Sequence, residues 1–337
     1  MKIGDIDTNK KVFVIAEIGN NHEGDFELAK KMIILAAESG ADAVKFQTFI
    51  PEKLVSFDEK SRLEQLKRYQ LNYSQFTDLA LLAKEKGLIF FSTPFDIKSA
   101  EFLNTLQPVF KIASGDNNFF PLIDVVASFG KPMIVSTGVS DYNLIQKIYD
   151  RIFNIWKNKK LFSELALLHC VSSYPVPDEQ ANLSSISFIK KHFSNIVVGY
   201  SDHTLGIDAA VSSVIAGARI IEKHFTIDKN YSDFRDHKLS ADPEEMYLLI
   251  QKVRKAEAML GKEEKKQQHC EKEMNVAGRR SIAASRDLLA GTKLLWTDFI
   301  WVRPGSGISP GDENLLIGKK INKDLKNGQI IKKSDLI

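Results

Sequence analysis

Eight short apolar runs follow one another along the chain, and segments with helical periodicity separate them. The runs lack the alternation of a half-exposed strand, so they are typical of strands in a parallel sheet that is buried on both faces. They comprise residues 12–18, 43–46, 88–91, 109–112, 132–135, 165–168, 196–198 and 218–221. Eight successive strand–helix units predict an α/β fold of the closed (β/α)8 type, a TIM barrel.

The segments between these runs carry the apolar spacing of amphipathic helices. Gly40 and Gly87 stand where the first two helices are expected to stop, because glycine readily adopts the backbone conformation of a helix C-terminus. The predicted helices are residues 26–39, 73–86, 97–106, 143–156, 183–192, 207–216 and 243–260.

The chain of 337 residues is longer than the ~250 residues that a minimal barrel of this kind needs. Beyond the last long helix a highly charged stretch is followed by short apolar runs, which Gly, Pro and Asp interrupt. We therefore predict a catalytic barrel over residues 1–262, a linker over 263–278 and a small, mostly β domain over 279–337.

Composition and charge exclude several classes of protein. The net charge of +3 is too small to indicate nucleic-acid binding, and the lysine runs at 157–160 and 262–266 are typical of solvated surface. No apolar run is long enough to cross a bilayer, and no apolar stretch follows the charged start. With two cysteines, Cys170 and Cys270, and no expected disulfide, we predict a cytoplasmic protein without membrane or nucleic-acid partners.

Ionisable and polar residues stand at the carboxyl ends of several predicted strands. Glu17 falls on an inward position of the first strand, and Lys45 with Gln47 on that of the second. Glu222 and His224 share the inward face of the eighth strand. Because catalytic side chains in such barrels come from the carboxyl ends of the strands, we expect these groups to gather at one mouth.

Two lysines interrupt buried strands, Lys45 in VKFQT and Lys111 in FKIASGD. A buried ammonium group is costly unless an anion compensates it. Either an anionic ligand or an internal ion pair could do so. Small donors follow the same strands, and with the two lysines they could hold a phosphorylated carboxylate. These donors are Thr93, Ser114, Gly115, Ser136, Thr137, Ser172, Ser173 and Ser201.

Two histidines follow neighbouring strands, His203 after VVGYSD and His224 within EKHFT. Imidazoles at adjacent strand ends can meet at one point above the barrel and bind a divalent metal ion, although a single histidine more often serves packing. The carboxylates that could complete or orient the metal shell are Asp202, Glu222 and Asp236.

Three further histidines precede or follow the predicted strands. His169 stands before Cys170 inside an apolar run, where a structural role is expected. His22 and His237 fall in polar loops at the same mouth, where each either contacts substrate or serves the loop.

A series of ordered motifs along nearly the whole chain resembles the sialic acid synthase family. The motifs are AEIGNNHEG, VKFQT, FSTPFD, KIASGDNNFFPL, STG, LLHCVSSYPVP, GYSDHTLG, EKHFT and RPGSG. The resemblance implies a barrel followed by a domain similar to type III antifreeze protein, also called a SAF or β-clip domain. It also implies that the enzyme condenses phosphoenolpyruvate with N-acetylmannosamine and water, and releases phosphate by carbon–oxygen cleavage.

The resemblance assigns roles to residues at the barrel mouth. Glu17 matches the acid or base that handles the attacking water. His203 and His224 match ligands of a manganese ion, for which Mg2+ or Co2+ could substitute, and that ion would polarise the aldehyde of the open-chain sugar. The residues implied to bind phosphoenolpyruvate are Lys45, Thr93, Lys111, Ser114, Ser172 and Ser201, and we add Gln47 to the substrate-binding set.

Other positions match residues of the acceptor site. Asp116, Tyr174 and Asp236 match positions that bind sugar hydroxyls, and Arg303 in RPGSG matches an arginine that reaches the barrel of a partner subunit. A domain-swapped homodimer is therefore implied. Asp116 and Ser172 differ from many bacterial members and resemble the animal enzymes, which use a 6-phosphorylated sugar. The acceptor could thus be N-acetylmannosamine, its 6-phosphate, or the diacetamido sugar of a legionaminic or pseudaminic acid synthase.

Two other classes of function remain as alternatives. A metal-dependent aldolase could use the same barrel with pyruvate, and it would not release phosphate. A Schiff-base mechanism is disfavoured because the strand lysines suit anions and the histidines suit a metal. A non-enzymatic carbohydrate-binding or ice-binding protein could be built around the terminal domain, but it would leave the barrel mouth without a role.

Overall fold

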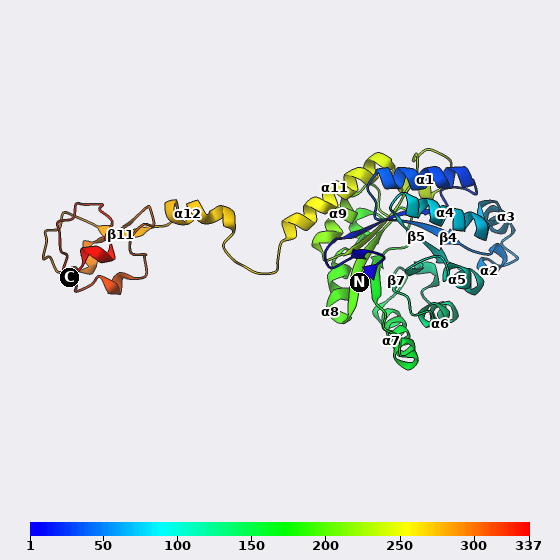
Figure 1. Ribbon diagram of the computed structural model, residues 1–337, viewed down its shortest axis with the longest axis horizontal. Helices are drawn as coiled ribbons and strands as arrows, with labels where there is room; N and C mark the ends of the chain where they lie inside the picture. The colour runs from blue at the N-terminus through cyan, green and yellow to red at the C-terminus, as the bar shows by residue number, and fades with distance from the viewer. The chain divides into compact units, whose positions relative to one another are not determined.

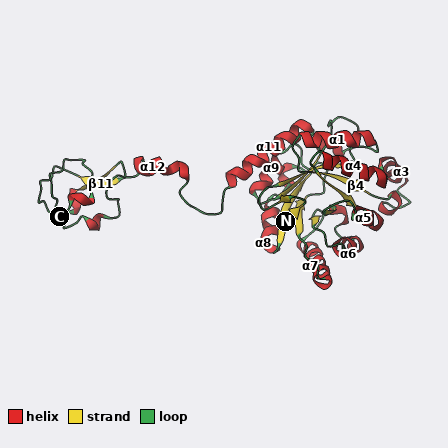
Figure 2. Ribbon diagram, viewed as in Figure 1, coloured by secondary structure: helices red, strands yellow, loops and turns green.

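The computed structural model describes residues 1–337, which divide into two units, Met1–Gly261 and Lys262–Ile337. Each unit is built around its own hydrophobic core, and Figures 1 and 2 show the helices and strands of both. None of the helices combines the length and the apolar character that crossing a bilayer requires.

Eight parallel strands of the N-terminal unit form one sheet with the order β5-β4-β3-β10-β9-β8-β7-β6. The two ends of this order, β5 and β6, also lie against each other, so the barrel is nearly closed. At this seam the Ser92 backbone N–H donates to Gln107 Oε1 at 2.7 Å, in place of a strand–strand bond. The strands are β3 Phe13–Gly19, β4 Ala43–Thr48, β5 Ile89–Pro94, β6 Phe110–Ile112, β7 Met133–Ser136, β8 Leu165–Cys170, β9 Ile196–Asp202 and β10 Ile220–His224. The predicted (β/α)8 barrel is confirmed.

Helices surround these strands on the outside of the barrel (Figure 2). Several begin at an aspartate or asparagine whose side chain accepts a hydrogen bond from the first turn, as Asp25, Asn72 and Asp141 do. The helices are α1 Phe26–Glu38, α2 Pro51–Leu54, α3 Lys60–Tyr69, α4 Tyr73–Glu85, α5 Ile97–Leu103, α6 Phe120–Ser128, α7 Tyr142–Lys159, α8 Ser184–His192, α9 Asp208–Ile215, α10 Asp236–Leu239 and α11 Pro243–Leu260.

The helices of the barrel that the periodicity did not predict are α2, α3, α6 and α10. α3 buries only Leu63, Leu66 and Tyr69 among its ten residues, so its apolar stripe is narrow. α6 has the opposite character, because FPLIDVVAS is apolar almost throughout and a short apolar run does not distinguish a helix from a strand. α5 ends at Leu103 rather than near residue 106, since a turn follows it.

A separate apolar cluster fills the interior of the barrel, where Phe13, Ile15, Phe91 and Ile220 are fully buried. The N-terminal hairpin of β1 Lys2–Ile3 and β2 Ile6–Asp7 adds Met1 and Ile3 to this cluster. Strands of two residues are too short to show periodicity, so this hairpin could not be predicted from the sequence. Because the interior is packed at the level of these residues, polar chemistry is confined to the layer at the carboxyl ends of the strands.

The C-terminal unit contains one short antiparallel pair, β11 Ser281–Ala284 and β12 Phe299–Val302, with isolated bridges and short 3-10 turns. Its core includes Ile282, Leu294 and Ile321. The charged stretch before it contains a 3-10 turn, His269–Glu271, and the short helix α12 Lys272–Ala277. The predicted mostly β character of the terminal domain agrees with these elements.

Candidate active site

The strand register brings the inward residues of neighbouring strands side by side. Glu17 on β3 pairs with Lys45 on β4 and with His224 on β10. Ser201 on β9 pairs with Glu222 on β10 in the same way. Because alternate residues of a strand point to the same face, these side chains form one polar layer above the apolar interior. The ionisable and polar side chains at the strand ends therefore lie together at one mouth, as predicted.

Two ammonium groups and two carboxylates meet in this layer. Lys45 Nζ lies 2.7 Å from Glu17 Oε2 and 3.7 Å from Glu222 Oε2. Lys111 Nζ lies 3.3 Å from Glu222 Oε1. All four side chains are buried, so water does little to screen their charges. Of the two explanations for the strand lysines, the internal ion pairs are thus present, and the anionic ligand stays a prediction.

Burial and charge divide the roles of the two carboxylates. Burial raises the pKa of Glu17 from 4.5 to about 7, and the nearby ammonium of Lys45 only partly opposes this effect. Burial acts on Glu222 as well, but Lys111 and Lys45 outweigh it and hold the Glu222 pKa at about 2. Burial lowers the pKa of Lys111 from its ordinary value. Near neutral pH the two lysines therefore face only one firmly ionised carboxylate, and Glu17 is poised to gain or lose a proton.

Hydroxyl and amide groups border the charged cluster. Thr93 Oγ1 accepts a hydrogen bond from Lys45 Nζ at 3.1 Å, and Ser201 Oγ donates to Glu222 Oε1 at 2.9 Å. Gln47 Nε2 donates to Glu17 Oε1 at 3.2 Å. These three predicted substrate-binding residues are therefore in direct contact with the charged cluster.

Two further hydroxyls, which follow β6 and β8, meet each other at the mouth. Ser172 Oγ donates to Ser114 Oγ at 2.8 Å. Gly138 leaves the room for this contact, since a Cβ atom there would lie 2.2 Å from Ser172 Oγ. Thr137 Oγ1, by contrast, donates to the backbone carbonyl of Leu168, which is a structural contact rather than an open donor.

The two predicted metal-binding histidines lie together at the mouth. The ring centroids of His203 and His224 are 5.4 Å apart, and the ring of Tyr174 lies 4.3 Å from that of His203. His203 Nδ1 contacts the Val171 carbonyl oxygen at 2.9 Å, which directs the other ring nitrogen away from the backbone. Nδ1 of His224 is buried without a hydrogen-bond partner. Burial, together with the charge on His203, lowers the pKa of His224 well below 6.5 and keeps its ring neutral. The neutral ring of His224, paired with that of His203, fits a divalent metal ion.

The carboxylates do not complete a metal shell. The prediction that Asp202 could do so is wrong, because Asp202 points to the outer side of β9 and pairs with Lys223 at 2.9 Å. Glu222 is held by the two inward lysines instead. No group of three or more His, Cys, Asp or Glu residues is arranged to hold a metal ion. The protein therefore offers two imidazoles, and solvent or substrate would have to fill the other positions of a bound ion.

Tyr174 and Asp236, two of the residues predicted to bind the acceptor sugar, lie beside the histidine pair. The guanidinium carbon of Arg235 lies 4.7 Å from the centre of the Tyr174 ring, and Arg235 Nε donates to Asp236 Oδ1 at 3.2 Å. Asp116 follows β6 on a short 3-10 turn, and its Oδ2 is buried without a partner. Burial raises the pKa of Asp116 to about 6 and raises that of Asp236 as well. Arg235 was not predicted, because a lone arginine in a polar loop carries no signal in the sequence.

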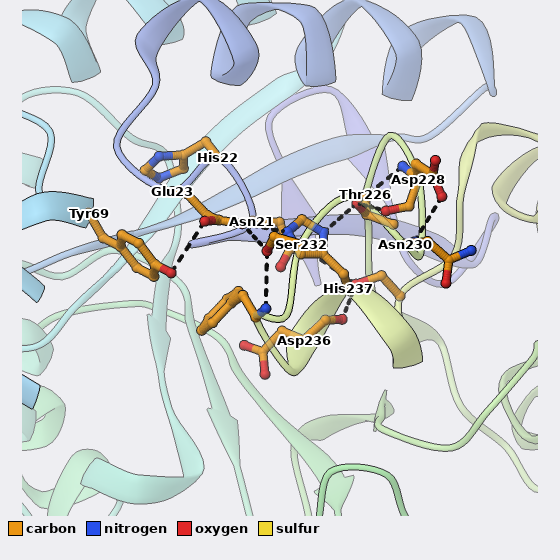
Figure 3. A network of polar contacts seen from close by, with 12 residues as sticks. Asn21, His22, Glu23, Tyr69, Thr226, Asp228, Asn230, Ser232, Asp236 and His237 are labelled. Atoms are coloured by element: carbon orange, nitrogen blue, oxygen red, sulfur yellow. Dashed lines mark hydrogen bonds and ion pairs between the residues drawn. The ribbon is translucent and has the colours of Figure 1, made fainter. Parts of the chain in front are cut away.

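The remaining histidines of the mouth serve its loops. Both ring nitrogens of His237 are engaged, Nε2 by Glu23 at 3.0 Å and Nδ1 by Thr226 at 2.6 Å (Figure 3). The alternative that His237 contacts substrate is therefore not supported.

Nδ1 of His22 accepts the backbone N–H of Gly24 at 3.0 Å, and burial lowers the His22 pKa to about 4. His169 contacts the Ala181 carbonyl at 2.8 Å, as a structural role requires.

Two further predictions concern Arg303 and the two cysteines. Arg303 is exposed and belongs to the C-terminal unit, so it is not among the residues that the barrel itself brings together. Its expected contact with a partner subunit stays a prediction. Cys170 and Cys270 are both free thiols, the first buried and the second exposed. The sequence predicted no disulfide between them.

Known proteins match this chain over most of its length. An uncharacterized protein of Methanocaldococcus jannaschii is 42% identical over 100% of this chain and 98% of its own. N,N'-diacetyllegionaminic acid synthase of Legionella pneumophila is 39% identical over 94% of this chain and 92% of its own. Relatives named pseudaminic acid synthase, from Campylobacter jejuni, and N-acetylneuraminate-9-phosphate synthase, from Homo sapiens, are 37% and 35% identical.

The fold comparison agrees with the sequence comparison. The crystal structure of an N-acetylneuraminic acid synthetase from Leptospira borgpetersenii, in complex with citrate, superposes with a TM-score of 0.75 at 35% identity. It covers 81% of this chain and 94% of the other. The NeuB family model matches residues 32–265, and the SAF domain model matches residues 279–337. The chain therefore belongs to the NeuB family, the family of sialic, legionaminic and pseudaminic acid synthases, and carries a SAF domain after its barrel.

Proposed function

We propose that this protein is a synthase of the transferase class, which condenses phosphoenolpyruvate with the open-chain form of an N-acetylated amino sugar and water, and releases phosphate. The observation that carries the proposal is the shared mouth at which the Lys45–Lys111 cluster and the His203–His224 pair lie. The names of the relatives, all synthases of nine-carbon sugar acids where a function is printed, support it.

Phosphoenolpyruvate would bind at the charged cluster. It carries a carboxylate and a phosphate, and the two ammonium groups of Lys45 and Lys111 face only one firmly ionised carboxylate in the protein. Charge-assisted hydrogen bonds to such groups are the strongest that a protein forms. The hydroxyls that could add donors are those of Thr93, Ser114, Ser172 and Ser201.

The reaction forms one carbon–carbon bond and breaks one carbon–oxygen bond. The methylene carbon of the enol ester attacks the aldehyde carbon, and the aldehyde oxygen takes up the electron pair and a proton. Water then adds to the oxocarbenium carbon that results, and its proton passes to the carboxylate of Glu17. The tetrahedral intermediate collapses to a ketone as phosphate leaves with the bridging oxygen. A carboxyl group whose pKa is about 7 suits both acceptance and return of that proton.

A divalent metal ion, Mn2+ with Mg2+ or Co2+ as alternatives, would be held by the imidazoles of His203 and His224. The neutral state of His224 and its unpartnered Nδ1 support this assignment. Such an ion, when bound, supplies a Lewis acid that polarises a carbonyl oxygen. The chain itself contributes the two nitrogen ligands and holds the ring of Tyr174 against His203.

The acceptor proposed from the sequence is N-acetylmannosamine, bound through Asp116, Tyr174 and Asp236. A diacetamido sugar is a second candidate, because relatives named legionaminic and pseudaminic acid synthases match at 39% and 37% identity. The 6-phosphate of N-acetylmannosamine is a third, from the relatives named 9-phosphate synthases. All three would present the same aldehyde to phosphoenolpyruvate and differ only in their substituents.

A homodimer would complete the acceptor site. In this proposal Arg303 of the SAF domain donates to the acceptor bound in the partner's barrel, since guanidinium groups donate to amide carbonyl and hydroxyl oxygens. The exposure of Arg303 in its own unit is compatible with such a role. Replacement of Arg303 by Ala should weaken acceptor use and leave the KM for phosphoenolpyruvate unchanged.

The decisive experiment incubates the protein with Mn2+, phosphoenolpyruvate and each acceptor in turn, and follows phosphate release and product mass. Product with an aldose of the N-acetylmannosamine type, with 18O from labelled water retained in the product ketone rather than in phosphate, would support the proposal. Condensation with pyruvate, without phosphate release, would instead identify an aldolase. His224→Ala should abolish Mn2+ binding, which electron paramagnetic resonance of the bound ion measures without any substrate.

A further inference from the structure

The segment between β10 and α11, residues 225–242, carries two residues that face the acceptor side of the mouth. Asp236 is buried there, and Arg235 stacks on Tyr174 while it pairs with Asp236. Most of this segment is loop, with only the four-residue helix α10 inside it. A loop of this kind does not hold a side chain in place by its own backbone, so other elements have to fix Arg235 and Asp236.

One carboxylate, that of Glu23, ties the segment to two other elements of the barrel (Figure 3). Glu23 Oε1 accepts hydrogen bonds from His237 Nε2 at 3.0 Å and from the Ser232 hydroxyl. Glu23 Oε2 accepts from the Tyr69 hydroxyl, at the end of α3, at 3.4 Å. Glu23 thus joins the loop after β3, the helix α3 and the segment after β10.

The loop that carries Glu23 is itself fixed. Glu23 has φ of 48°, in the left-handed region that a non-glycine residue seldom adopts. The next residue, Gly24, lies so close to α3 that a Cβ atom there would be 1.9 Å from the Arg68 carbonyl oxygen. Backbone strain and close approach of this kind persist only where the surroundings determine the conformation. Glu23 is therefore a rigid anchor for the more loosely built segment.

The anchored residues are next to the acceptor residues in the chain. His237 follows Asp236 directly and is fully buried between Glu23 and Thr226. A second tie supports the same point, because Asn21 Nδ2 donates to Ser240 Oγ at 2.9 Å and Ser240 Oγ donates to the Asp236 carbonyl at 2.6 Å. Two residues of the β3 loop therefore hold the backbone on both sides of Asp236.

We infer that Glu23 is a positioning residue for the acceptor sugar: through His237 and Ser232 it holds the segment that presents Arg235 and Asp236 at the mouth. The inference rests on the proposed function for what the segment binds, and on geometry alone for what holds the segment. Glu23 makes no hydrogen bond to Lys45, Lys111 or Glu222, so its effect should not extend to phosphoenolpyruvate.

Steady-state kinetics and proteolysis of the full chain test this inference together. Glu23→Ala should raise the KM for the acceptor by about tenfold, the loss expected when hydrogen bonds to a charged group are removed, and change the KM for phosphoenolpyruvate less than twofold. Trypsin should cut the variant faster after Lys229, Arg235 or Lys238, which all lie in the segment. Glu23→Gln, which keeps the shape and an accepting oxygen, should recover part of both properties.

Glu27→Gln is the matched control, because Glu27 lies four residues further on and is exposed on α1. It should behave as the unchanged protein in both assays. If Glu23→Ala does not fold, Ser232→Ala and Tyr69→Phe each remove one partner of the same carboxylate and should show smaller shifts in the same direction. Unchanged cleavage of the segment would overturn the anchoring role even if the protein had no synthase activity. Faster cleavage with equal changes in both KM values would overturn the selective role in acceptor binding.

Discussion

Neighbouring residues on β9 and β10 build two very different groups of buried charges. On the outer face, Lys223 Nζ lies 2.9 Å from Asp202 Oδ2 and donates to the Thr204 carbonyl at 2.6 Å. Asp202 Oδ1 in turn accepts both the backbone N–H and the hydroxyl of Thr204. On the inner face, one residue away, Ser201 and Glu222 belong to the cluster with Lys45 and Lys111.

The difference between the two groups is the balance of charge. The outer pair holds one cation and one anion, each with its hydrogen bonds satisfied, and both side chains are fully buried. The inner cluster holds two lysines, of which Lys111 has a pKa lowered by burial, one firm anion in Glu222 and a carboxyl group in Glu17 whose pKa is about 7. A balanced and fully hydrogen-bonded ion pair such as Lys223–Asp202 is typical of a structural role. An unbalanced, titratable cluster is typical of a site that receives a charged ligand. Burial alone would not have distinguished them.

Removal of one partner of the outer pair should have the largest effect on stability. Lys223→Ala leaves Asp202 buried without its cation, which costs about 3–5 kcal/mol in the free energy of unfolding. Urea unfolding, followed by circular dichroism, measures the loss. A loss of less than about 1 kcal/mol in the free energy of unfolding would contradict the structural role of the pair.

Glu17→Gln should have the largest effect on turnover. The amide keeps the hydrogen-bonding shape of the side chain but cannot take up a proton, so kcat should fall by about 10²–10⁴, the usual contribution of a general acid or base. Phosphate release under saturating substrates gives kcat, and retained binding of phosphoenolpyruvate is the control. If kcat is preserved, another group handles the proton.

The same residue should make stability depend on pH. The pKa of Glu17 is raised by burial from 4.5 to about 7, so the folded protein binds more protons than the unfolded chain between these values. Its contribution is complete below pH 4.5 and is lost as the pH rises through about 7, with a size of about 3 kcal/mol at most. The free energy of unfolding should therefore fall more between pH 4.5 and pH 7.5 in the unchanged protein than in Glu17→Gln. Equal declines would place the Glu17 pKa near its ordinary value.

Replacement of both members of the outer pair should have the smallest effect. Lys223→Met combined with Asp202→Asn removes both charges at once, and the Asn side-chain oxygen can still accept from Thr204. Because removal of a whole buried ion pair is often neutral or stabilising, the free energy of unfolding should not fall by more than about 1 kcal/mol. The double-mutant cycle with Lys223→Met and Asp202→Asn as its single variants measures the interaction energy of the pair. The same kind of exchange at Lys45 and Glu17 should abolish turnover, which sharpens the contrast between the two groups.

The strands and most long helices could be predicted from the sequence, because burial on both faces makes a strand a continuous apolar run and burial of one face gives a long helix an apolar stripe of helical period. The runs at 12–18 and 165–168 became β3 and β8 with small shifts of their ends. Elements without that signal could not be predicted. The two-residue strands β1 and β2 have no period, and the apolar run of α6 is compatible with a helix or a strand.

The side chains that point inward at the mouth could also be predicted from the sequence. The two-residue period of a strand determines that Glu17, Lys45 and Glu222 share the inner face, and the parallel order of the barrel brings their strand ends to one layer. The period also places Asp202 on the face opposite to Ser201. Its prediction as a metal ligand failed because proximity to His203 in the chain was given more weight than this alternation.

The sequence by itself determined which residue types stand at which strand ends, since strand period and topology follow from local patterns of burial. Only the tertiary structure decided which of those groups are charged near neutral pH. The pKa of Glu17 and that of Glu222 differ because of how many ammonium groups surround each carboxylate in space. Likewise, Glu23 and His237 lie 214 positions apart in the chain, and only the packing of their two loops makes one hold the other.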